Sequence, residues 1–483
     1  MTEQTTYQKK FNNEEPISYI IGGGEAAEIF LKNIISYQYS IAGIFDDNTK
    51  LHGKKIEGVP ILGFIRDLGA FLDKKIVKNI IYLIPSIHIG QYIDLFNEIR
   101  NKYPNIEWLS TPPLNDISQG LKSLFELTNL NLIPVNKTST NLSVSDYQKQ
   151  KVLGKSALIT GGAGSIGSQL VGELLLFDIF ETIVVVDNNE MSAYKLSQDF
   201  AVELAQRKLF IHLIDFGEVD EMNDLLVCYQ PAYVYHVGAY KHVNILEGGN
   251  VYSAINNNVI KSIKLLNVTL THDFVKTFVL VSSDKAVNPK SVMGYTKRLT
   301  ELCLLSLCSK SSLDMITVRF GNVVGSSGSV FHKFLKQIQG RQKITLTDLN
   351  VTRYFMNISQ AASLIIKSSL IGERNRVYVL NMGDPVKIYD FLMEMINKHG
   401  DPSQINSIAI TGLHTGEKLE EELHYLHENI KPLDNDILAS DSLVSEINTN
   451  KILEQFKEFR SIRDEKKLKS WLHKSISSYE DGK

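Results

Sequence analysis

One short stretch constrains the fold of this chain more than any other. Residues 156–177 read SALITGGAGSIGSQLVGELLLF, an apolar strand that meets four closely spaced glycines and continues as an amphipathic helix. Such a turn suits the pyrophosphate of a dinucleotide, because glycines let the backbone approach the phosphates at a helix N-terminus. The stretch therefore predicts the start of an α/β domain with a cofactor. Its predicted cofactor-binding residues are Gly161, Gly164, Ser165, Ile166 and Gly167.

An acidic residue ends each of the next two strands. TIVVVD ends at Asp187, where a carboxylate accepts a hydrogen bond from a ribose 2′-hydroxyl and repels a 2′-phosphate, which favours NAD over NADP. Asp215, at the end of FIHLID, is the second acidic residue assigned to the cofactor. The alternative for Asp187 is a structural role as the cap of the following helix.

Further apolar strands at 233–238, 277–283 and 315–322 alternate with helical segments. Continuous apolar strands separated by helices are typical of a parallel sheet covered on both faces. In such sheets ligands bind beyond the carboxyl ends of the strands. The predicted fold class is therefore α/β, with a doubly wound parallel sheet and a site at that edge.

A second, weaker turn of the same kind lies near the N-terminus. The apolar strand 17–21 precedes Gly22-x-Gly24-x-x-Ala27, and the next strand ends at Asp46. The pattern predicts a Rossmann-like domain. Many non-catalytic α/β domains need a glycine there only to bend the chain, so nucleotide binding by this domain stays open.

The 483 residues are too many for one ordinary core, so we expect at least two domains. A stretch rich in Ser, Thr and Asn predicts the linker between them. The C-terminal segment contains a basic amphipathic helix with Trp471, for which core packing or an oligomer contact is favoured over a membrane surface. The predicted parts are a polar tail (1–16), a Rossmann-like domain (17–128), a linker (129–154), an NAD-binding catalytic domain with a substrate subdomain (155–440) and a C-terminal helical segment (441–483).

Composition excludes several functional classes. The net charge is -3 and no basic stripe occurs, so we expect no nucleic-acid partner. The cysteines, Cys228, Cys303 and Cys308, are too few and scattered for disulfides or zinc, so we expect no metal and a reduced, cytoplasmic setting. No apolar run reaches the length of about 18 residues that a membrane span requires.

Six motifs follow one another along the chain: TGGAGSIG, AYKHV, SSDKAVNP, VRFGNVVGSSGSV, TRYFM and TGLHTGEKLEEEL. Together they resemble the nucleotide-sugar 4,6-dehydratases of the extended short-chain dehydrogenase/reductase superfamily. More narrowly, they resemble the large polysaccharide-biosynthesis branch that acts on UDP-N-acetylglucosamine. The resemblance implies NAD as cofactor, a nucleotide-sugar substrate and a small C-terminal substrate-binding subdomain. We also expect a homo-oligomer.

The chain departs from this pattern at several points. Large members of the branch usually carry membrane helices before the first domain, and residues 1–16 contain none. The linker lacks the usual acidic, leucine-rich segment. His414 and Thr415 replace an arginine and a proline, so the contacts to the nucleotide phosphates are expected to differ. Met293 stands where the wider superfamily has tyrosine, but the branch itself typically has methionine there.

The resemblance gives the chemistry to the stretch SSDKAVNPKSVMGYTK. Lys285 would remove the C5 proton of a 4-keto sugar, and Asp284 would protonate the departing C6 hydroxyl. A lysine base must be partly neutral and an aspartic acid must hold a proton, and we expect burial to favour both forms. The alternative is a surface ion pair that contributes little.

Lys297 lies four residues after Met293, on the same face of the predicted helix, and the resemblance assigns it to the nicotinamide ribose. Tyr295 does not replace the missing phenol, because two positions turn a helical side chain by roughly 200°. Asp284, a water bound to Lys297, or Ser283 as a relay could accept the proton of the 4-hydroxyl. Met293 is either an apolar floor of the site or a core residue. The predicted catalytic residues are Ser283, Asp284, Lys285, Met293 and Lys297.

The predicted substrate-binding residues are Tyr240, Lys241, His242, Arg319, Asn322, Arg353, His414 and Glu417. Arg319 fits a diphosphate bidentately, with a structural salt bridge as the alternative. Two rival functions remain. A 4-epimerase of the same fold needs no acid at C6, so the Asp284–Lys285 pair disfavours it. A non-catalytic sensor of NAD or a sugar nucleotide is favoured by Met293 and His414.

Overall fold

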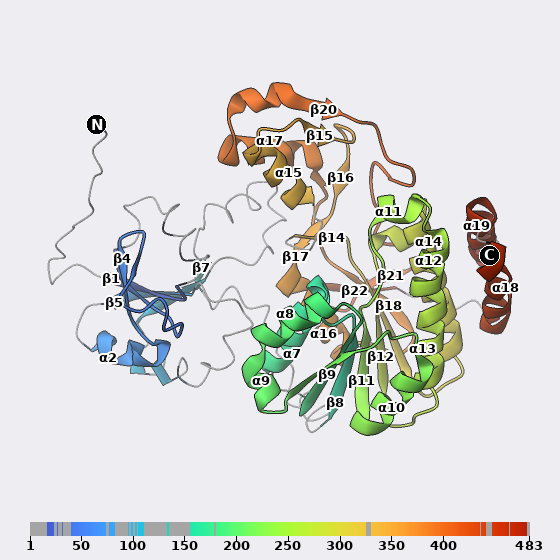
Figure 1. The fold of residues 1–483 in the computed structure, drawn as a ribbon, viewed down its shortest axis with the longest axis horizontal. Coiled ribbons are helices and arrows are strands. Elements are labelled where there is room, and N and C mark those ends of the chain that lie inside the picture. Colours follow the sequence, from blue (N-terminus) through green and yellow to red (C-terminus); the bar gives the residue numbers. More distant parts are fainter. Residues whose placement is uncertain are drawn as a thin grey trace. The chain divides into compact units, whose positions relative to one another are not determined.

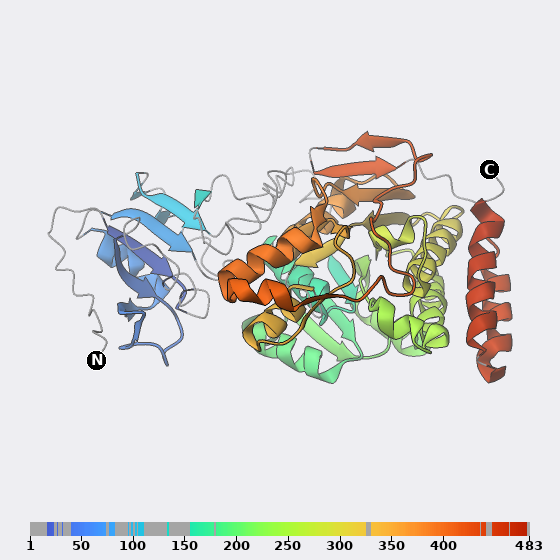
Figure 2. The same ribbon diagram turned by 90° about the horizontal axis from the view of Figure 1, so that it is seen from above.

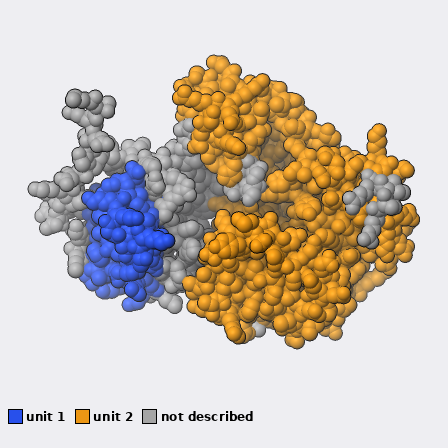
Figure 3. All heavy atoms as spheres, in the orientation of Figure 1, with its two compact units in different colours: residues 1–142 blue, residues 143–483 orange. Residues whose placement is uncertain are grey.

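The protein, a computed structural model, divides into two compact units, Met1–Leu142 and Ser143–Lys483 (Figures 1 and 3). The predicted tail lies outside the described residues. The predicted linker does too, except for strand β7 (Ile133–Pro134). The structure describes residues 17–23, 27, 31, 40–73, 77–82, 95, 98–99, 102–103, 105–110, 133–134, 155–177, 180–324, 330–434, 436–440, 447–462 and 464–480.

The larger unit is built on a sheet of nine strands among the described residues. Its strands are rich in β-branched residues and buried on both faces, as parallel strands between two helical layers must be. In spatial order the parallel strands are β10 (Leu209–Leu213), β9 (Thr182–Asp187), β8 (Ser156–Thr160), β11 (Pro231–His236), β12 (Thr277–Val281), β13 (Asp314–Arg319) and β18 (Arg376–Leu380). The antiparallel strands β22 (Ile437–Ser440) and β21 (Ile430–Pro432) complete the edge (Figure 2).

The strand order changes direction between β8 and β11, so their carboxyl ends open a crevice where ligands bind in such folds. Helices α7 (Ser165–Phe177) and α16 (Ile358–Ile371) pack against each other on one face of the sheet. Helices α10 (Val219–Tyr229), α13 (Lys261–Thr269) and α14 (Val292–Cys308) cover the other face (Figure 1). The doubly wound parallel sheet predicted from the sequence is confirmed.

A small subdomain lies beyond the carboxyl ends of the strands (Figure 1). Its short strands pair as β14–β17, β15–β20 and β16–β19. It consists of β14 (Asn322–Val324), α15 (Val330–Gln339), β15 (Ile344–Leu346), β16 (Thr352–Arg353), β17 (Phe355–Asn357), β19 (Val386–Lys387), α17 (Ile388–His399) and β20 (Ile408–Ile410). Figure 3 shows the larger unit hollowed on this face, between subdomain and sheet.

Two C-terminal helices, α18 (Thr449–Ile462) and α19 (Glu465–Glu480), complete the main hydrophobic core. Leu468 and Leu472 are buried against α14, and Trp471 packs beside Phe456. The amphipathic pattern therefore serves core packing, as the sequence favoured. No described helix combines the length and the apolar character that crossing a bilayer requires.

The smaller unit holds a second sheet, in the order β3-β4-β2-β1-β5-β6-β7. After β1 (Ile17–Ile21), the carboxylate of Asp46 accepts a hydrogen bond from the Gly23 amide (2.5 Å) and so braces the turn. Gly24 lies outside the described residues, and nucleotide binding by this unit stays a prediction. The remaining strands are β2 (Ile41–Phe45), β3 (Lys55–Ile56), β4 (Val59–Gly63), β5 (Val77–Tyr82) and β6 (Glu107–Ser110).

We expect Leu472→Ala to lower the free energy of unfolding by about 2–5 kcal/mol, because it opens a cavity where α19 joins the core. Chemical denaturation of the full chain measures the change. Leu426→Ala is the matched control, since Leu426 is 95% exposed. Equal stabilities of the two variants would show that α19 does not contribute to the core.

Candidate functional site

The glycine turn after β8 needs its glycines for two different reasons. Gly161 has a φ of 68°, and a Cβ there would lie 2.5 Å from the Cα of Gly238. A Cβ on Gly167 would lie 2.2 Å from the Gly161 carbonyl oxygen, so α7 packs directly on the turn. A Cβ on Gly164 meets only that carbonyl oxygen, at 3.3 Å, which leaves its other side open. The turn is thus a backbone cradle at a helix N-terminus, where anions bind.

Asp187, at the end of β9, braces this cradle. Its Oδ2 accepts a hydrogen bond from the Ala163 amide (3.0 Å), and its Oδ1 accepts one from the Asn189 amide (2.9 Å). Asn189, and not Asp187, caps helix α8 (Glu190–Asp199), because its side chain accepts from the Ser192 amide (2.9 Å). The helix-capping alternative for Asp187 is therefore wrong.

A groove of about 650 Å³ runs past the cradle and Asp187. Its walls carry no cation beside Asp187, where the neighbouring lining residues are Asn188 and Asn189. This arrangement fits a dinucleotide with unmodified ribose hydroxyls better than one with a 2′-phosphate. The groove includes all five predicted residues of the turn: Gly161, Gly164, Ser165, Ile166 and Gly167.

The structure does not bring Asp215 into the groove, although sequence reasoning placed it there. Its carboxylate forms an ion pair with Lys261 and accepts from the Gly217 amide (2.9 Å). Burial raises the pKa of Asp215, but the Lys261 ammonium outweighs it, so the pKa lies below its usual value. Phe216 lines the groove instead.

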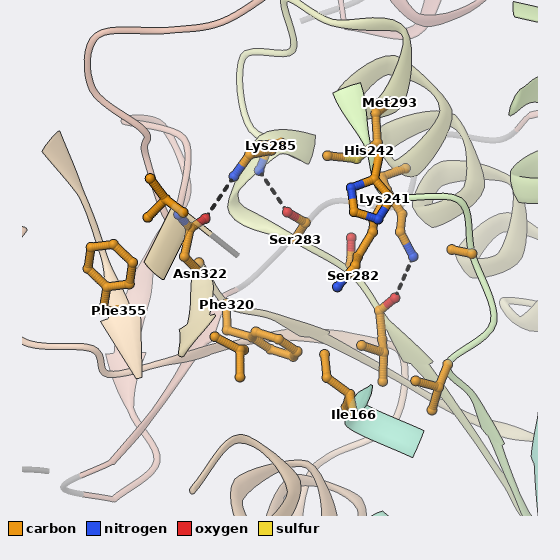
Figure 4. A pocket seen from close by; sticks show the side chains of 17 residues that line it. Ile166, Lys241, His242, Ser282, Ser283, Lys285, Met293, Phe320, Asn322 and Phe355 are labelled. Atoms are coloured by element: carbon orange, nitrogen blue, oxygen red, sulfur yellow. Dashed lines mark hydrogen bonds between the residues drawn. The ribbon is translucent and has the colours of Figure 1, made fainter. Parts of the chain in front are cut away.

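A second cavity, of about 290 Å³, adjoins the groove (Figure 4). The two share the lining residues Ile166, Val237, Ala239, Lys241 and His242, so they form one continuous site. A molecule in the small cavity would lie next to the end of a dinucleotide in the groove. The other cavity residues are Val281, Ser282, Ser283, Lys285, Met293, Lys297, Phe320, Gly321, Asn322, Val323, Val330 and Phe355.

Asp284 and Lys285 meet where β12 ends in a short 3-10 turn. Asp284 is fully buried, and its Oδ1 lies 3.0 Å from Lys285 Nζ and accepts from the Ser283 hydroxyl (2.8 Å). Lys285 Nζ also donates to Asn322 Oδ1 (3.3 Å), toward which it points in Figure 4. Among the described residues, Asp284 Oδ2 has no hydrogen-bond partner. The alternative of a solvated surface pair is therefore wrong.

The protonation expected for Lys285 needs a correction. Burial alone lowers the pKa of Lys285, but the carboxylate of Asp284 and that of Glu421, 3.6 Å from Nζ, outweigh it. The pKa of Lys285 is therefore raised, and the ligand-free site holds an ammonium rather than a partly neutral amine. Sequence reasoning missed this because Glu421 is far away along the chain.

Met293 and Lys297 lie in the first two turns of α14 and face the small cavity. Lys297 Nζ donates to the Val281 carbonyl (2.8 Å), and burial lowers its pKa to about 8, against the opposing charge of Glu301. Tyr295 points away, as the helical geometry predicted, and packs against the ring of His473 (5.4 Å). Met293 thus forms part of the cavity wall while also joining the core.

Tyr240, Lys241 and His242 line the groove, and Asn322 lines the small cavity, as expected of ligand-binding residues. The other predicted substrate residues lie in the subdomain and line neither cavity. There Arg353 Nη2 donates to Glu417 Oε1 (3.1 Å), and the His414 amide donates to Glu417 Oε2 (3.1 Å). The structure joins Arg353, His414 and Glu417 to one another rather than to the cavity.

Arg319 does not serve as a phosphate ligand. Its guanidinium is fully buried and bonds both carboxylate oxygens of Glu301 (2.8 and 2.7 Å) and both of Glu428 (3.1 Å each). The structural salt bridge that the sequence left as the alternative is therefore the one observed. The network extends to Ser282, whose hydroxyl donates to Glu301 Oε1 (2.6 Å), and to Arg298 (3.3 Å).

Sequence reasoning also missed two buried asparagines. Asn257 and Asn258 lie in a π-helical turn between α12 (Val251–Ile255) and α13. Asn257 lines the groove, and Asn258 pairs with the Tyr240 backbone (2.8 and 3.0 Å) and with Thr296 (3.0 Å). The signal was present, because consecutive asparagines inside an apolar helix need buried partners and π-turns often mark functional sites.

The fold and the joined cavities define a Rossmann-type protein with the architecture of the extended short-chain dehydrogenases/reductases. A family model described as "Polysaccharide biosynthesis protein" matches residues 157–440, and the chain belongs to this family. The family predicted from the motifs is confirmed at this level.

Known proteins similar to this chain agree with that assignment. "Probable polysaccharide biosynthesis protein EpsC" of Bacillus subtilis is 32% identical over 412 residues, which cover 84% of this chain and 67% of the relative. A "UDP-glucose 4-epimerase" of Rickettsia akari is 28% identical over 272 residues, 56% of this chain and 77% of its own. The solved structure of Pen from Bacillus thuringiensis aligns with 29% identity and a TM-score of 0.55, covering 60% of this chain and 88% of Pen.

Replacing Arg319 tests its structural role. Arg319→Leu should lower the free energy of unfolding by about 3–5 kcal/mol, because two buried carboxylates lose the cation that they share. Denaturant titration measures the loss. Arg376→Leu on β18 is the control, since its pair with Glu373 is partly exposed and contributes little. Unchanged stability with weakened nucleotide binding would restore the phosphate-binding role.

Proposed function

We propose that the protein is an NAD-dependent nucleotide-sugar 4,6-dehydratase with UDP-N-acetylglucosamine as its substrate, which it converts to the UDP-4-keto-6-deoxy sugar for surface-glycan or rare-sugar synthesis. One observation carries the proposal: a buried Asp284–Lys285 pair lies in a small cavity that continues into a dinucleotide-sized groove. The family match and the names of the relatives support nucleotide-sugar chemistry.

The chemistry that bound NAD supplies is reversible hydride transfer, from C4 of the sugar and later back to C6. The 4-hydroxyl must lose its proton as the ketone forms. Asp284 Oδ2 is buried without a partner among the described residues, so it can accept this proton. We therefore assign Asp284, among the acceptors that the sequence left open, to the 4-hydroxyl.

Water loss then requires a base and an acid on the same sugar. Lys285 in its amine form takes the C5 proton, and the electron pair of that bond forms the C5–C6 double bond as the C6–O bond breaks. Asp284 gives the proton received from the 4-hydroxyl to the leaving oxygen, which departs as water. Lys285 returns its proton to C5 when the hydride reaches C6. No external acid or reductant is consumed.

Lys297 and Met293 complete the cavity wall. The Lys297 cation is anchored to the Val281 carbonyl, in the position expected to hold the nicotinamide ribose. Met293 offers an apolar surface where a phenol would otherwise compete with Asp284 for the 4-hydroxyl proton.

A second candidate is a nucleotide-sugar 4-epimerase, which the name of the Rickettsia akari relative favours. An epimerase removes and returns a hydride at C4 and needs no acid–base pair at C5 and C6. The buried pair therefore favours the dehydratase.

Asp284→Asn and Lys285→Ala should each reduce water loss from UDP-N-acetylglucosamine by at least about 10²-fold, because a proton-transfer group is removed. Mass spectrometry of the product measures the loss of one water molecule, and the nicotinamide content of the purified variants shows whether the groove is intact. Glu420→Gln, an exposed change nearby, should behave as the wild type.

The same assay separates the rival functions. A product of unchanged mass from the wild-type protein indicates the epimerase. Failure to convert any of several nucleotide sugars indicates a binding protein that senses them. Full water loss by both variants would contradict the roles given to Asp284 and Lys285.

A further inference from the structure

Glu421 is a buried carboxylate that faces the proposed catalytic lysine from a distant part of the chain. Its side chain is 4% exposed, and its Oε1 lies 3.6 Å from Lys285 Nζ. Within the described part of the chain, its Oε2 has no hydrogen-bond partner, although Lys418 Nζ lies 3.7 Å away. Buried polar atoms without partners are rare and often have a catalytic use.

The position of Glu421 does not depend on its pairing with Lys285. The segment 418–425, which carries Glu421, is fastened to the loop that follows Lys285 by contacts of its own. These are hydrogen bonds from Lys418 Nζ to the Val287 carbonyl (2.7 Å), from the Tyr425 hydroxyl to the Ala286 carbonyl (3.2 Å) and from Asn288 Nδ2 to Glu422 Oε2 (2.8 Å). The fold therefore holds a carboxylate next to the lysine even when the lysine changes its charge.

The charges around this pair are few. Lys285 faces the carboxylates of Asp284 and Glu421, with the Arg353 guanidinium as the opposing charge. Glu421 faces Lys285, Asp284, Arg353 and Lys418. Burial raises the pKa of Glu421 although the three cations oppose it, so Glu421 holds a proton more readily than an exposed glutamate does.

We propose that Glu421 is the positioning residue that converts Lys285 into a neutral base, by holding its ammonium beside Asp284 and accepting its proton when substrate fills the cavity. In this step the Nζ–H bond of Lys285 breaks and a bond from that proton to Glu421 Oε1 forms. The ammonium becomes an amine and the carboxylate becomes a carboxylic acid, so the summed charge of the pair is unchanged. Its catalytic meaning rests on the proposed dehydration.

The proposal resolves a conflict within the site. A lysine flanked by two carboxylates is an ammonium, which cannot remove the C5 proton. Release of its proton to solvent would leave net negative charge in a buried cavity, which is unfavourable. Transfer to Glu421 leaves two neutral groups instead. The 3.6 Å separation needs to close by only a few tenths of an ångström for a hydrogen bond.

The coupling can be measured on the full chain without any substrate. Trace labelling with acetic anhydride at a series of pH values, followed by mass spectrometry of the peptide that contains Lys285, reports the pKa of its amine. Glu421→Gln removes one of the two negative neighbours that raise this pKa. The labelling midpoint of Lys285 should therefore move to lower pH by about one to three units.

Two variants serve as controls. Glu420→Gln makes the same chemical change one residue away, on an exposed side chain, and should leave the midpoint in place. Glu421→Asp keeps a carboxylate in the cavity, so its midpoint should lie closer to that of the wild type than to that of Glu421→Gln. An unmoved midpoint in Glu421→Gln, or identical behaviour of the Asp and Gln variants, would overturn the inference.

The kinetic arm uses UDP-N-acetylglucosamine. Glu421→Gln should lower kcat at neutral pH by about 10²-fold with little change in KM, and its rate should rise with pH as Lys285 loses its proton to solvent. Wild-type kcat in Glu421→Gln beside an active wild-type enzyme sinks this inference alone. A wild-type protein that expels no water sinks the proposed function, whatever the labelling shows.

Discussion

The buried ion network around Arg319 holds together the parts of the chain that form the site. It joins Glu301 on α14, Arg319 at the end of β13 and Glu428 beyond the subdomain, and it reaches Ser282 at the end of β12. Each charge is costly to bury alone, and the group is stable only when all partners are present. The strand end that leads into Asp284 is therefore fixed by charges rather than by packing alone.

The same segment that anchors this network also sets the electrostatics of the cavity. Residues 418–428 carry Glu428 to Arg319 and Glu421 to Lys285. A lysine base next to Asp284 alone would form a neutral pair, whereas the second carboxylate adds a place for its proton. The chemistry that we propose thus depends on a subdomain segment far from the glycine turn in sequence.

Much of the fold could be predicted because its requirements are local. The glycines at 161, 164 and 167 are needed within one turn, and apolar runs separated by helices specify a parallel sheet. The grouping of Ser283 and Lys285 with Met293 and Lys297 also followed from spacing along one strand end and one helix. Arg319 and Arg353 were assigned to phosphates wrongly or without support, because an arginine in sequence does not reveal which carboxylate meets it.

The sequence by itself determined the dinucleotide turn, the doubly wound sheet and the adjacency of Asp284 and Lys285, since each depends on residues within a few positions of one another. Only the tertiary structure decided that Arg319 is a buried structural cation and that Glu421 faces Lys285. Charge pairing and burial depend on which distant segments meet and exclude water, and no local spacing encodes that. For the same reason, the protonation of Lys285 could not be deduced from its neighbours in the chain.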